Sequence, residues 1–225
     1  MTEMLIGVGL LLLLAGIGFP LGFSLLFIGA GGIAYIHPKG WDAAGTVAGQ
    51  QIIDLASNPQ FAVLPLFMLM GVFVNRSGIS DNVYDTASKW LGHMRGGLAL
   101  STVAACGGMA AISGSSMATA VTMSRVAVPA MRRYNYNDAF SAGTVAAGGT
   151  IGILIPPSGA LILYGLLAEV DIAKLFMAGL VPGIISIIFY FIAIQVVCIL
   201  KPEWAPRGER ASWAEAVHSL RDVLA

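Results

Sequence analysis

The sequence predicts an all-α polytopic membrane protein in which polar, glycine- and proline-rich breaks interrupt the apolar segments. Of its 225 residues, 57% are hydrophobic and only 11% are charged, whereas a soluble domain carries about 25% charged residues. A soluble fold of this length could not cover its surface with so few charges, so lipid is the natural solvent for the chain. The twelve basic and twelve acidic residues balance, which gives no signal for a nucleic-acid partner.

The first apolar stretch, Met4–Ile36, is interrupted at Gly18-Phe19-Pro20. It is too long for one membrane span, which needs about 20 residues, so we expect two short helices that turn near Pro20. The stretch has neither a basic leader nor a small-residue cleavage site, and we expect it to be retained in the membrane. The polar segment His37–Gln60 follows, with Trp41 as the expected interface anchor.

The next two segments differ in polarity. Phe61–Val74 is apolar, contains Pro65 and is short for a full span. Asn75–Arg95 mixes charges with apolar residues such as Trp90, a pattern typical of an amphipathic helix lying in the membrane interface. An ordinary loop helix would give the same pattern, and the sequence leaves both open.

Residues 96–130 predict a re-entrant helical hairpin. The segment is apolar at both ends and polar in the middle, at Ile112-Ser113-Gly114-Ser115-Ser116. Each apolar arm has about 15 residues, which at ~1.5 Å per residue is too short to cross the bilayer alone. A hairpin with Ser113–Ser116 at its tip solves this, provided that protein or a cavity surrounds the non-helical backbone.

Residues 139–167 predict a broken helix. Glycines at Gly148-Gly149 and the run Gly152–Ser158, which includes Pro156 and Pro157, interrupt an apolar stretch. Two consecutive prolines cannot continue a helix, because each lacks an N–H donor and clashes with the preceding turn. We therefore expect a half-helix, an unwound middle and a second half-helix.

The C-terminal part predicts a short loop at Glu169–Lys174, a long apolar helix at Leu175–Leu200 and an amphipathic helix at Trp213–Leu224. We assign residues 1–201 to a transmembrane repeat, and residues 202–225 to a cytoplasmic linker and the start of a connecting helix. A re-entrant hairpin begins and ends on the same side of the membrane, so the polar segments before and after it lie on one face. Most basic residues are then on that face, which the positive-inside rule makes cytoplasmic. The residues counted there are Arg76, Lys89, Arg95, Arg132, Arg133, Lys201, Arg207, Arg210 and Arg221, against Lys39 and Lys174 on the other face.

The two breaks carry the functional signal. Discontinuous helices leave carbonyl groups that can bind a cation such as sodium, and helix N-termini whose partial positive charge can face an anionic substrate. The hydroxyl groups in the breaks suit either purpose; they belong to Ser113, Ser115, Ser116 and Ser158. Small residues and serines also mediate tight helix packing in membranes, and this alternative stays open.

Other residues give little sign of chemistry. Arg125 lies ten residues past Ser115, or ~15 Å along a helix, and we interpret it as an interfacial anchor. Cys106 and Cys198 lie in apolar runs and are expected to be buried small residues. The sequence contains no catalytic motif, metal-ligand spacing or intramembrane carboxylate pair. We therefore expect no enzyme activity, no cofactor and no metal other than sodium.

Several motifs resemble the large membrane subunit of TRAP transporters, the DctM-type permease. The resemblance runs from about Leu5 to the end of the chain and is most specific in the two breaks. The motifs are Ala111–Ser116 with Ala118–Ala120, Ala146–Ser158, Leu64-Pro65-Leu66-Phe67 with Met70-Gly71, and Lys174-Leu175-Phe176 with Ala178-Gly179.

The resemblance implies a sodium-driven secondary transporter of the bacterial inner membrane that imports small organic acids, such as dicarboxylates or sialic acid. It implies two partners, a periplasmic substrate-binding protein and a small membrane subunit. It also implies an elevator-type fold of the ion transporter superfamily, built from two inverted repeats that each hold one hairpin and one broken helix. Family members are longer, and this chain resembles only the first repeat, so we expect an incomplete chain.

On this basis we assign candidate sites within the breaks. Sodium is expected at Ser113, Gly114, Ser115, Ser116, Gly152 and Pro156, and the organic acid at Ser116, Thr119, Pro157 and Ser158. Two other functions remain open: a related ion-coupled carrier without a binding protein, and a non-transporting structural subunit.

Overall fold

The computed structural model describes residues 2–206, 208 and 212–224. Every regular element in this described part of the chain is an α-helix or a short 3-10 helix. Contacts divide the chain into two compact units, Met1–Phe61 and Ala62–Ala225, and each is described by itself. The all-helical class predicted from the sequence is confirmed, whereas the membrane repeat over residues 1–201 stays a prediction.

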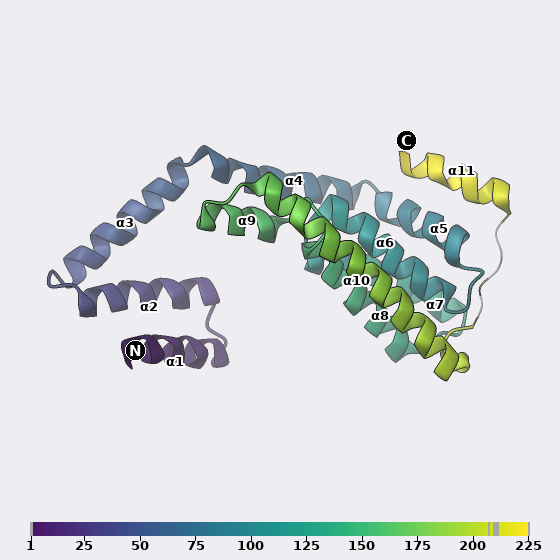
Figure 1. The fold of residues 1–225 in the computed structure, drawn as a ribbon, viewed down its shortest axis with the longest axis horizontal. Helices are drawn as coiled ribbons and strands as arrows, with labels where there is room; N and C mark the ends of the chain where they lie inside the picture. Colours follow the sequence, from purple (N-terminus) through teal and green to yellow (C-terminus); the bar gives the residue numbers. More distant parts are fainter. Residues whose placement is uncertain (1, 207, 209–211, 225) are drawn as a thin grey trace. The chain divides into compact units, whose positions relative to one another are not determined.

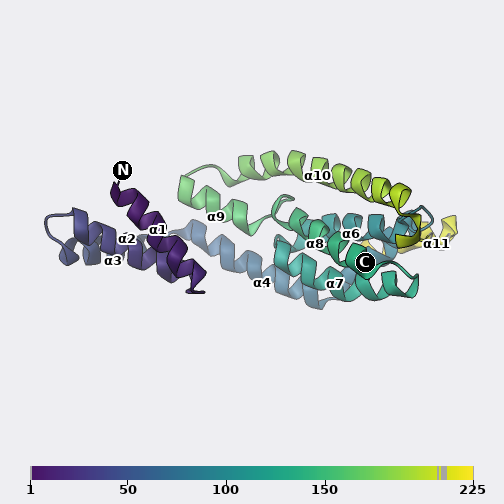
Figure 2. The same cartoon turned by 90° about the horizontal axis from the view of Figure 1, so that it is seen from below.

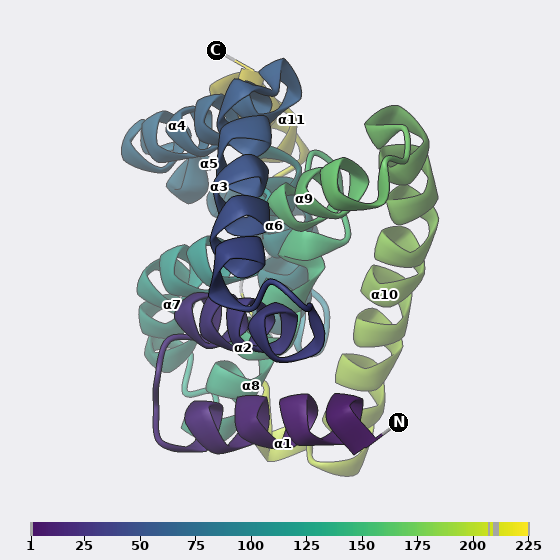
Figure 3. The same cartoon turned by 90° about the vertical axis from the view of Figure 1, so that its left-hand side faces the viewer.

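The first unit contains three helices, α1 (Thr2–Gly16), α2 (Leu21–Ile36) and α3 (Trp41–Ser57). The two short helices expected around Pro20 are α1 and α2, which pack against each other, and α2 packs against α3 (Figure 3). The chain turns at Gly18, which has φ +85°, and the Ser24 hydroxyl donates to the Pro20 carbonyl at 3.2 Å. The polar segment, for which the sequence predicted only an interface anchor, forms α3.

The second unit begins with α4 (Val63–Arg76) and α5 (Ile79–Leu91) and continues through the two broken segments to a long helix and a final short one (Figure 1). Its other helices are α6 (Gly97–Ser113), α7 (Ser116–Arg133), α8 (Asp138–Thr150), α9 (Gly159–Ala168), α10 (Ile172–Leu200) and α11 (Trp213–Leu224). The breaks predicted at Ser113–Ser116 and Gly152–Ser158 are both present, and the α-helices are interrupted at residues 114–115 and 151–158.

Helices α6, α7 and α8 pack against one another, and α10 lies along α6 and α8 (Figure 2). Helix α6 is the centre of this unit, because it also contacts α4 and α5. Its sequence of glycine, alanine and serine allows neighbouring backbones to approach closely. Thirteen of its 17 residues are buried, which agrees with this central position.

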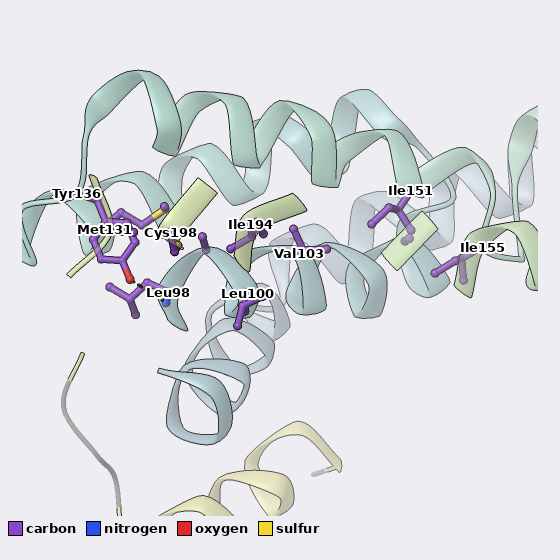
Figure 4. Packing of buried hydrophobic residues seen from close by; sticks show 12 residues of the cluster. Leu98, Leu100, Val103, Met131, Tyr136, Ile151, Ile155, Ile194 and Cys198 are labelled. Carbon is purple, nitrogen blue, oxygen red and sulfur yellow. Dashed lines mark hydrogen bonds between the residues drawn. The ribbon is translucent and has the colours of Figure 1, made fainter. Parts of the chain in front are cut away.

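The buried core joins α6 to the ends of α7, α8 and α10 (Figure 4). The Leu98 amide donates to the Tyr136 hydroxyl at 3.3 Å, and this satisfies one of the free N–H groups in the first turn of α6. Residues around them complete the cluster, among them Leu100, Val103, Met131, Ile151, Ile155, Ile194 and Cys198.

The arms α6 and α7 form an antiparallel hairpin. The Thr102 hydroxyl near the start of α6 contacts the Met131 sulfur near the end of α7 at 3.7 Å. At the other end of the hairpin, the hydroxyls of Ser113 and Thr119 share a hydrogen bond of 2.8 Å. The hairpin expected from the sequence is therefore present, and its re-entry into the membrane stays a prediction.

The helix α10 begins three residues earlier than the sequence predicted. The Asp171 carboxylate accepts a hydrogen bond from the Ala173 amide at 2.8 Å, so Asp171 caps the helix and shortens the expected loop. By length and composition α10 can cross a membrane, with a mean hydropathy of 2.6. The pair Val63–Val74 and Ile79–Leu91, bent by 65°, passes the same test as one broken span.

The last helix, α11, folds back onto α5. The Trp90 Nε1–H donates to the Ala216 carbonyl and the Thr86 hydroxyl to the Ser219 carbonyl, both at 3.0 Å. The amphipathic helices predicted at Asn75–Arg95 and Trp213–Leu224 thus exist and contact each other, while their place in the membrane interface stays a prediction. Two of the basic residues predicted to lie on the cytoplasmic face, Arg207 and Arg210, are outside the described residues.

Candidate functional site

The hairpin tip is a two-residue break between α6 and α7. Gly114 adopts the left-handed conformation, with φ +56°, and its amide donates to the Ala110 carbonyl at 3.0 Å. Glycine takes this conformation without steric cost, and so ends the helix. Ser115 is extended, and its hydroxyl accepts from the Ala118 amide at 3.3 Å. One residue therefore stops α6, and the next one caps α7.

The second break has the same order of a helix end, an irregular segment and a serine cap. After α8 a 3-10 turn, Ile151–Ile153, leads into Pro156 and Pro157, which are joined by a cis peptide bond. Proline has no N–H group, so the carbonyls of Gly152 and Ile153 lack their helical donors four residues on. The Ser158 hydroxyl then accepts from the Leu161 amide at 3.4 Å and caps α9.

The two breaks lie against each other. The Gly159 amide, the first of α9, donates to the Gly114 carbonyl at 3.3 Å. A Cβ atom built on Gly152 would lie 2.9 Å from the Ser115 carbonyl oxygen and from the Ser116 Cα. A Cβ atom on Gly114 would collide with the Pro157 carbonyl oxygen. Glycine is required at both positions because backbone meets backbone there.

This arrangement brings several helix ends together, and the described residues of the two breaks, 113–116 and 151–159, include no ionisable side chain. The N-termini of α7 and α9 meet near the C-termini of α6 and of the 3-10 turn. Helix N-termini carry partial positive charge and C-termini partial negative charge. The site can therefore present carbonyl oxygens to a cation and N–H groups to an anion from backbone alone.

The predicted sodium residues lie together at these breaks. Gly114 and Gly152 are buried, and Ser113 is buried with 7% of its surface exposed. Ser115 and Ser116 are half-buried and contact Gly152 through their backbones. Pro156 is half-buried in the second break, one residue before Pro157.

The predicted substrate residues fall into two groups. Ser116 and Pro157 are half-buried. Thr119 and Ser158 have no exposed surface. Their hydroxyl groups already have partners, because Thr119 shares a hydrogen bond with Ser113 and Ser158 caps α9. In the described conformation these two side chains hold the breaks in shape.

The structure adds two residues of α4 that the sequence did not place at the site. The ring of Phe67 lies against Gly114, and Gly71 lies against the Ser113 carbonyl. The only sequence signal for them was the family resemblance around Leu64–Gly71, which did not indicate what they contact.

The remaining candidates lie outside the breaks. Arg125 is exposed on α7. Cys106 and Cys198 are free and buried, as expected. Among the described residues no group of three or more His, Cys, Asp or Glu side chains could hold a metal ion. A groove of about 320 Å³ lies between α8 and α10, lined by residues such as Phe140, Gly143, Ala193 and Trp204, none of which belongs to a break.

Comparison with known proteins gives a consistent family. Residues 8–225 match the family described as the tripartite ATP-independent periplasmic transporter, DctM component. The C4-dicarboxylate TRAP transporter large permease protein DctM of Pseudomonas aeruginosa is 37% identical over 174 residues, which cover 77% of this chain and 40% of that protein. The isethionate TRAP transporter permease protein DctMQ of Oleidesulfovibrio alaskensis is 38% identical over 170 residues, or 76% of this chain and 26% of that protein.

A third relative extends the match along nearly the whole chain. The 2,3-diketo-L-gulonate TRAP transporter large permease protein YiaN of Escherichia coli is 35% identical over 224 residues, which cover 97% of this chain and 50% of that protein. The chain therefore spans half the length, or less, of these curated relatives.

Proposed function

Since the chain belongs to the DctM component family of tripartite ATP-independent periplasmic transporters, we propose that it forms part of the membrane subunit of a sodium-coupled importer of small organic acids. The observation that carries this proposal is the hydrogen bond between the two breaks, from the Gly159 amide to the Gly114 carbonyl at 3.3 Å. It holds the ends of two discontinuous segments together, and such ends are typical of the ion and substrate sites of secondary transporters.

Sodium binding is supported by the carbonyl groups that the breaks release from helical hydrogen bonding. Gly152 and Ile153 lose their donors to the prolines, and Ser113 ends α6 beside Gly114. Hard cations such as sodium favour oxygen ligands, and unwound backbone near a helix C-terminus supplies them. The hydroxyls of Ser115 and Ser116 are half-buried and close enough to the break to contribute.

An organic acid is supported as the substrate class by the named relatives and by the helix ends. The relatives are named for C4-dicarboxylates, isethionate and 2,3-diketo-L-gulonate, which are small anions with carboxylate or sulfonate groups. The first turns of α7 and α9 face the break and favour negative charge. Ser116 and Pro157 are half-buried, so such an anion would reach the breaks at these two side chains.

The same proposal includes the partners and the architecture. A periplasmic binding protein would deliver the substrate, a small membrane subunit would accompany this chain, and the assembly would span the bacterial inner membrane several times. The hairpin would be re-entrant and would form one inverted repeat of an elevator-type fold. The large exposed apolar surface supports burial in lipid: Met177, Phe189 and Leu200 of α10 are 77%, 64% and 74% exposed.

The test is sodium-dependent uptake by the intact transporter that contains this chain, reconstituted in proteoliposomes with its binding protein and a C4-dicarboxylate or another small acid. Ser115→Ala and Ser116→Ala each remove one hydroxyl from the break. We expect either variant to raise the sodium concentration for half-maximal uptake by roughly 10-fold, because the ion would lose one oxygen ligand; such a change corresponds to about 1.4 kcal/mol of binding free energy.

The matched control is Ser124→Ala, because Ser124 lies on the exposed side of α7 and donates only to its own helix, to the Val121 carbonyl. Unchanged sodium dependence in both break variants would remove the serines from the site. Uptake that needs no binding protein would favour the related carrier, and absence of uptake from the intact system would favour a structural subunit.

A further inference from the structure

Helix α4 reaches both broken segments through one face. It packs against α6 and against α9, the arm before the first break and the half-helix after the second. Phe67 and Gly71 lie one turn apart on that face, since residues four apart in a helix share a side. Both residues lie in the segment Leu64–Gly71, one of the motifs that resemble the family. The proposed sodium and substrate sites do not include this segment.

The two residues make complementary contacts with the hairpin tip. The Phe67 ring occupies the space into which a Cβ atom on Gly114 would project. A Cβ atom on Gly71 would lie 3.5 Å from the Ser113 carbonyl oxygen, which is ordinary van der Waals contact. A longer side chain at this position would have to fit between α4 and the end of α6. Gly71 therefore marks where α4 packs on the tip, and Phe67 covers it.

The exposure of neighbouring residues shows that α4 packs on the tip through one face. Leu66 and Met68 on either side of Phe67 are 65% and 62% exposed, whereas Phe67 is half-buried and Gly71 is buried. The less exposed positions of α4 (Leu64, Phe67, Gly71 and Val74) recur every three or four residues and so form one face of the helix. Phe67 and Gly71 are the two of them that contact the hairpin tip.

An aromatic ring at this place has a clear physical effect. Carbonyl oxygens that have lost their helical donors bind water when water can reach them. The attraction between such oxygens and a cation is stronger where water is excluded, because the local dielectric constant is lower. A ring packed on Gly114 excludes water from one side of the tip and limits movement of its backbone.

We propose that Phe67, on the face of α4 that also carries Gly71, is a positioning residue for the sodium ion: it seals the α4 side of the two breaks and holds their carbonyl groups in the geometry that binds the ion. This inference rests on the proposed sodium coupling. It predicts that changes at Phe67 act on sodium affinity, although the side chain offers sodium no ligand atom.

The experiment measures uptake against sodium concentration in the intact transporter, reconstituted with its binding protein. Phe67→Ala opens the seal, and we expect it to raise the sodium concentration for half-maximal uptake by about tenfold, a typical coupling between packed groups. Phe67→Leu keeps most of the apolar volume and should restore most of the affinity. Met68→Ala is the matched control, because it truncates the exposed neighbour.

A second pair of variants keeps the inference testable if Phe67→Ala lowers expression. Gly71→Leu adds side-chain atoms beyond a Cβ that would already be in contact with the Ser113 carbonyl, so we expect it to displace α4 from the tip and to cause the same loss of sodium affinity. Val72→Leu adds bulk at the adjacent position, which is 50% exposed, and should leave sodium affinity unchanged. A melting temperature measured for each variant separates loss of folding from loss of affinity.

Water access gives an independent readout. In a chain with Ser115→Cys, a membrane-impermeant thiol reagent should label the tip several times faster when Phe67→Ala is also present. Cys106 and Cys198 are buried and free, so the parent chain without Ser115→Cys supplies the background rate.

The outcomes separate the two proposals. If uptake by the parent transporter does not depend on sodium, the proposed function fails. If the parent depends on sodium but Phe67→Ala and Gly71→Leu behave like Met68→Ala and Val72→Leu, the inference about Phe67 is overturned and the proposed function stands. A tenfold loss of sodium affinity that Phe67→Leu largely restores, at an unchanged melting temperature, supports both.

Discussion

At the scale of single residues, three glycines and two serines decide how the breaks are built. Gly114 supplies the left-handed turn, while Gly152 lets the second break approach the backbone of Ser115. Ser115 and Ser158 each accept one amide hydrogen bond in the first turn of the following helix. The third glycine, Gly71, lies where α4 packs on the end of α6. The sequence predicted the breaks from the glycines, prolines and serines within them, since their effects on the backbone are local, but it did not place Gly71 at the site.

The close contact between Gly152 and the backbone of Ser115 and Ser116 can be tested by a single substitution. We expect Gly152→Ala to destabilise the protein by about 1–3 kcal/mol, as overpacking does, because its methyl group would meet backbone that has no rotamer to change. Thermal unfolding of the intact transporter, followed together with uptake, measures the effect.

Gly159→Ala is the matched control in the same break. A Cβ atom there meets nothing within 4 Å, and alanine keeps the amide that donates to Gly114. We expect its melting temperature to be unchanged or slightly raised. Equal stability of Gly152→Ala and Gly159→Ala would contradict the close approach of the two breaks.

At the scale of elements, each broken segment consists of two helices whose ends are closed by local chemistry. The hairpin arms are separated by Gly114, which ends α6, and Ser115, which caps α7, and α8 and α9 are separated by a turn and two prolines. The sequence predicted these element types and most boundaries within a few residues. It did not predict α3, because a polar composition gives no clear membrane signal, and it placed the start of α10 three residues late, because the apolar run begins after the cap at Asp171.

The cap of α9 can be tested by itself. Ser158→Ala removes the hydroxyl that accepts from Leu161, and we expect the first turn of α9 to lose about 1 kcal/mol of stability. Hydrogen exchange of the α9 amides should become roughly fivefold faster, which corresponds to that free energy. Ser158→Thr keeps a capping hydroxyl and should exchange nearly as the parent does, and equal exchange in the alanine variant would contradict the cap.

At the scale of the whole molecule, the exposed apolar surface and the long-range contacts decide the character of the protein. Helix α1 has no buried residue within the structure described here, and most apolar side chains of α10 are exposed, as expected for a member of a membrane-permease family. The composition predicted this surface, because a chain with 11% charged residues has too few to cover itself. The chain end that folds back on α5 was not predictable, since residues over 120 positions apart form that contact.

The contact between α5 and α11 provides the prediction at this scale. Trp90→Phe keeps the aromatic ring but removes the Nε1–H that donates to Ala216, and Thr86→Val removes the second donor. We expect the double variant to weaken the docking of α11 by about 1–3 kcal/mol, at roughly 1 kcal/mol for each lost hydrogen bond. Limited proteolysis or hydrogen exchange of α11 measures it.

The control for this variant is Ser88→Ala, because Ser88 lies on α5 but its hydroxyl donates to the Asp85 carbonyl of its own helix. Uptake by the intact transporter can be followed in the same preparations. If α11 is equally protected in the double variant and the control, the two hydrogen bonds do not hold it on α5.

The sequence by itself determined that this chain is an all-α membrane protein with two helix breaks, because those properties depend on composition and on residues close together in the chain. Proline lacks an N–H wherever it stands, glycine tolerates a left-handed turn, and a serine before a helix caps it. Only the tertiary structure decided that the breaks meet through Gly159 and Gly114, that Thr119 is turned to Ser113, and that Phe67 covers the tip. These contacts join segments distant in sequence or depend on how a side chain is oriented, so no local pattern encodes them.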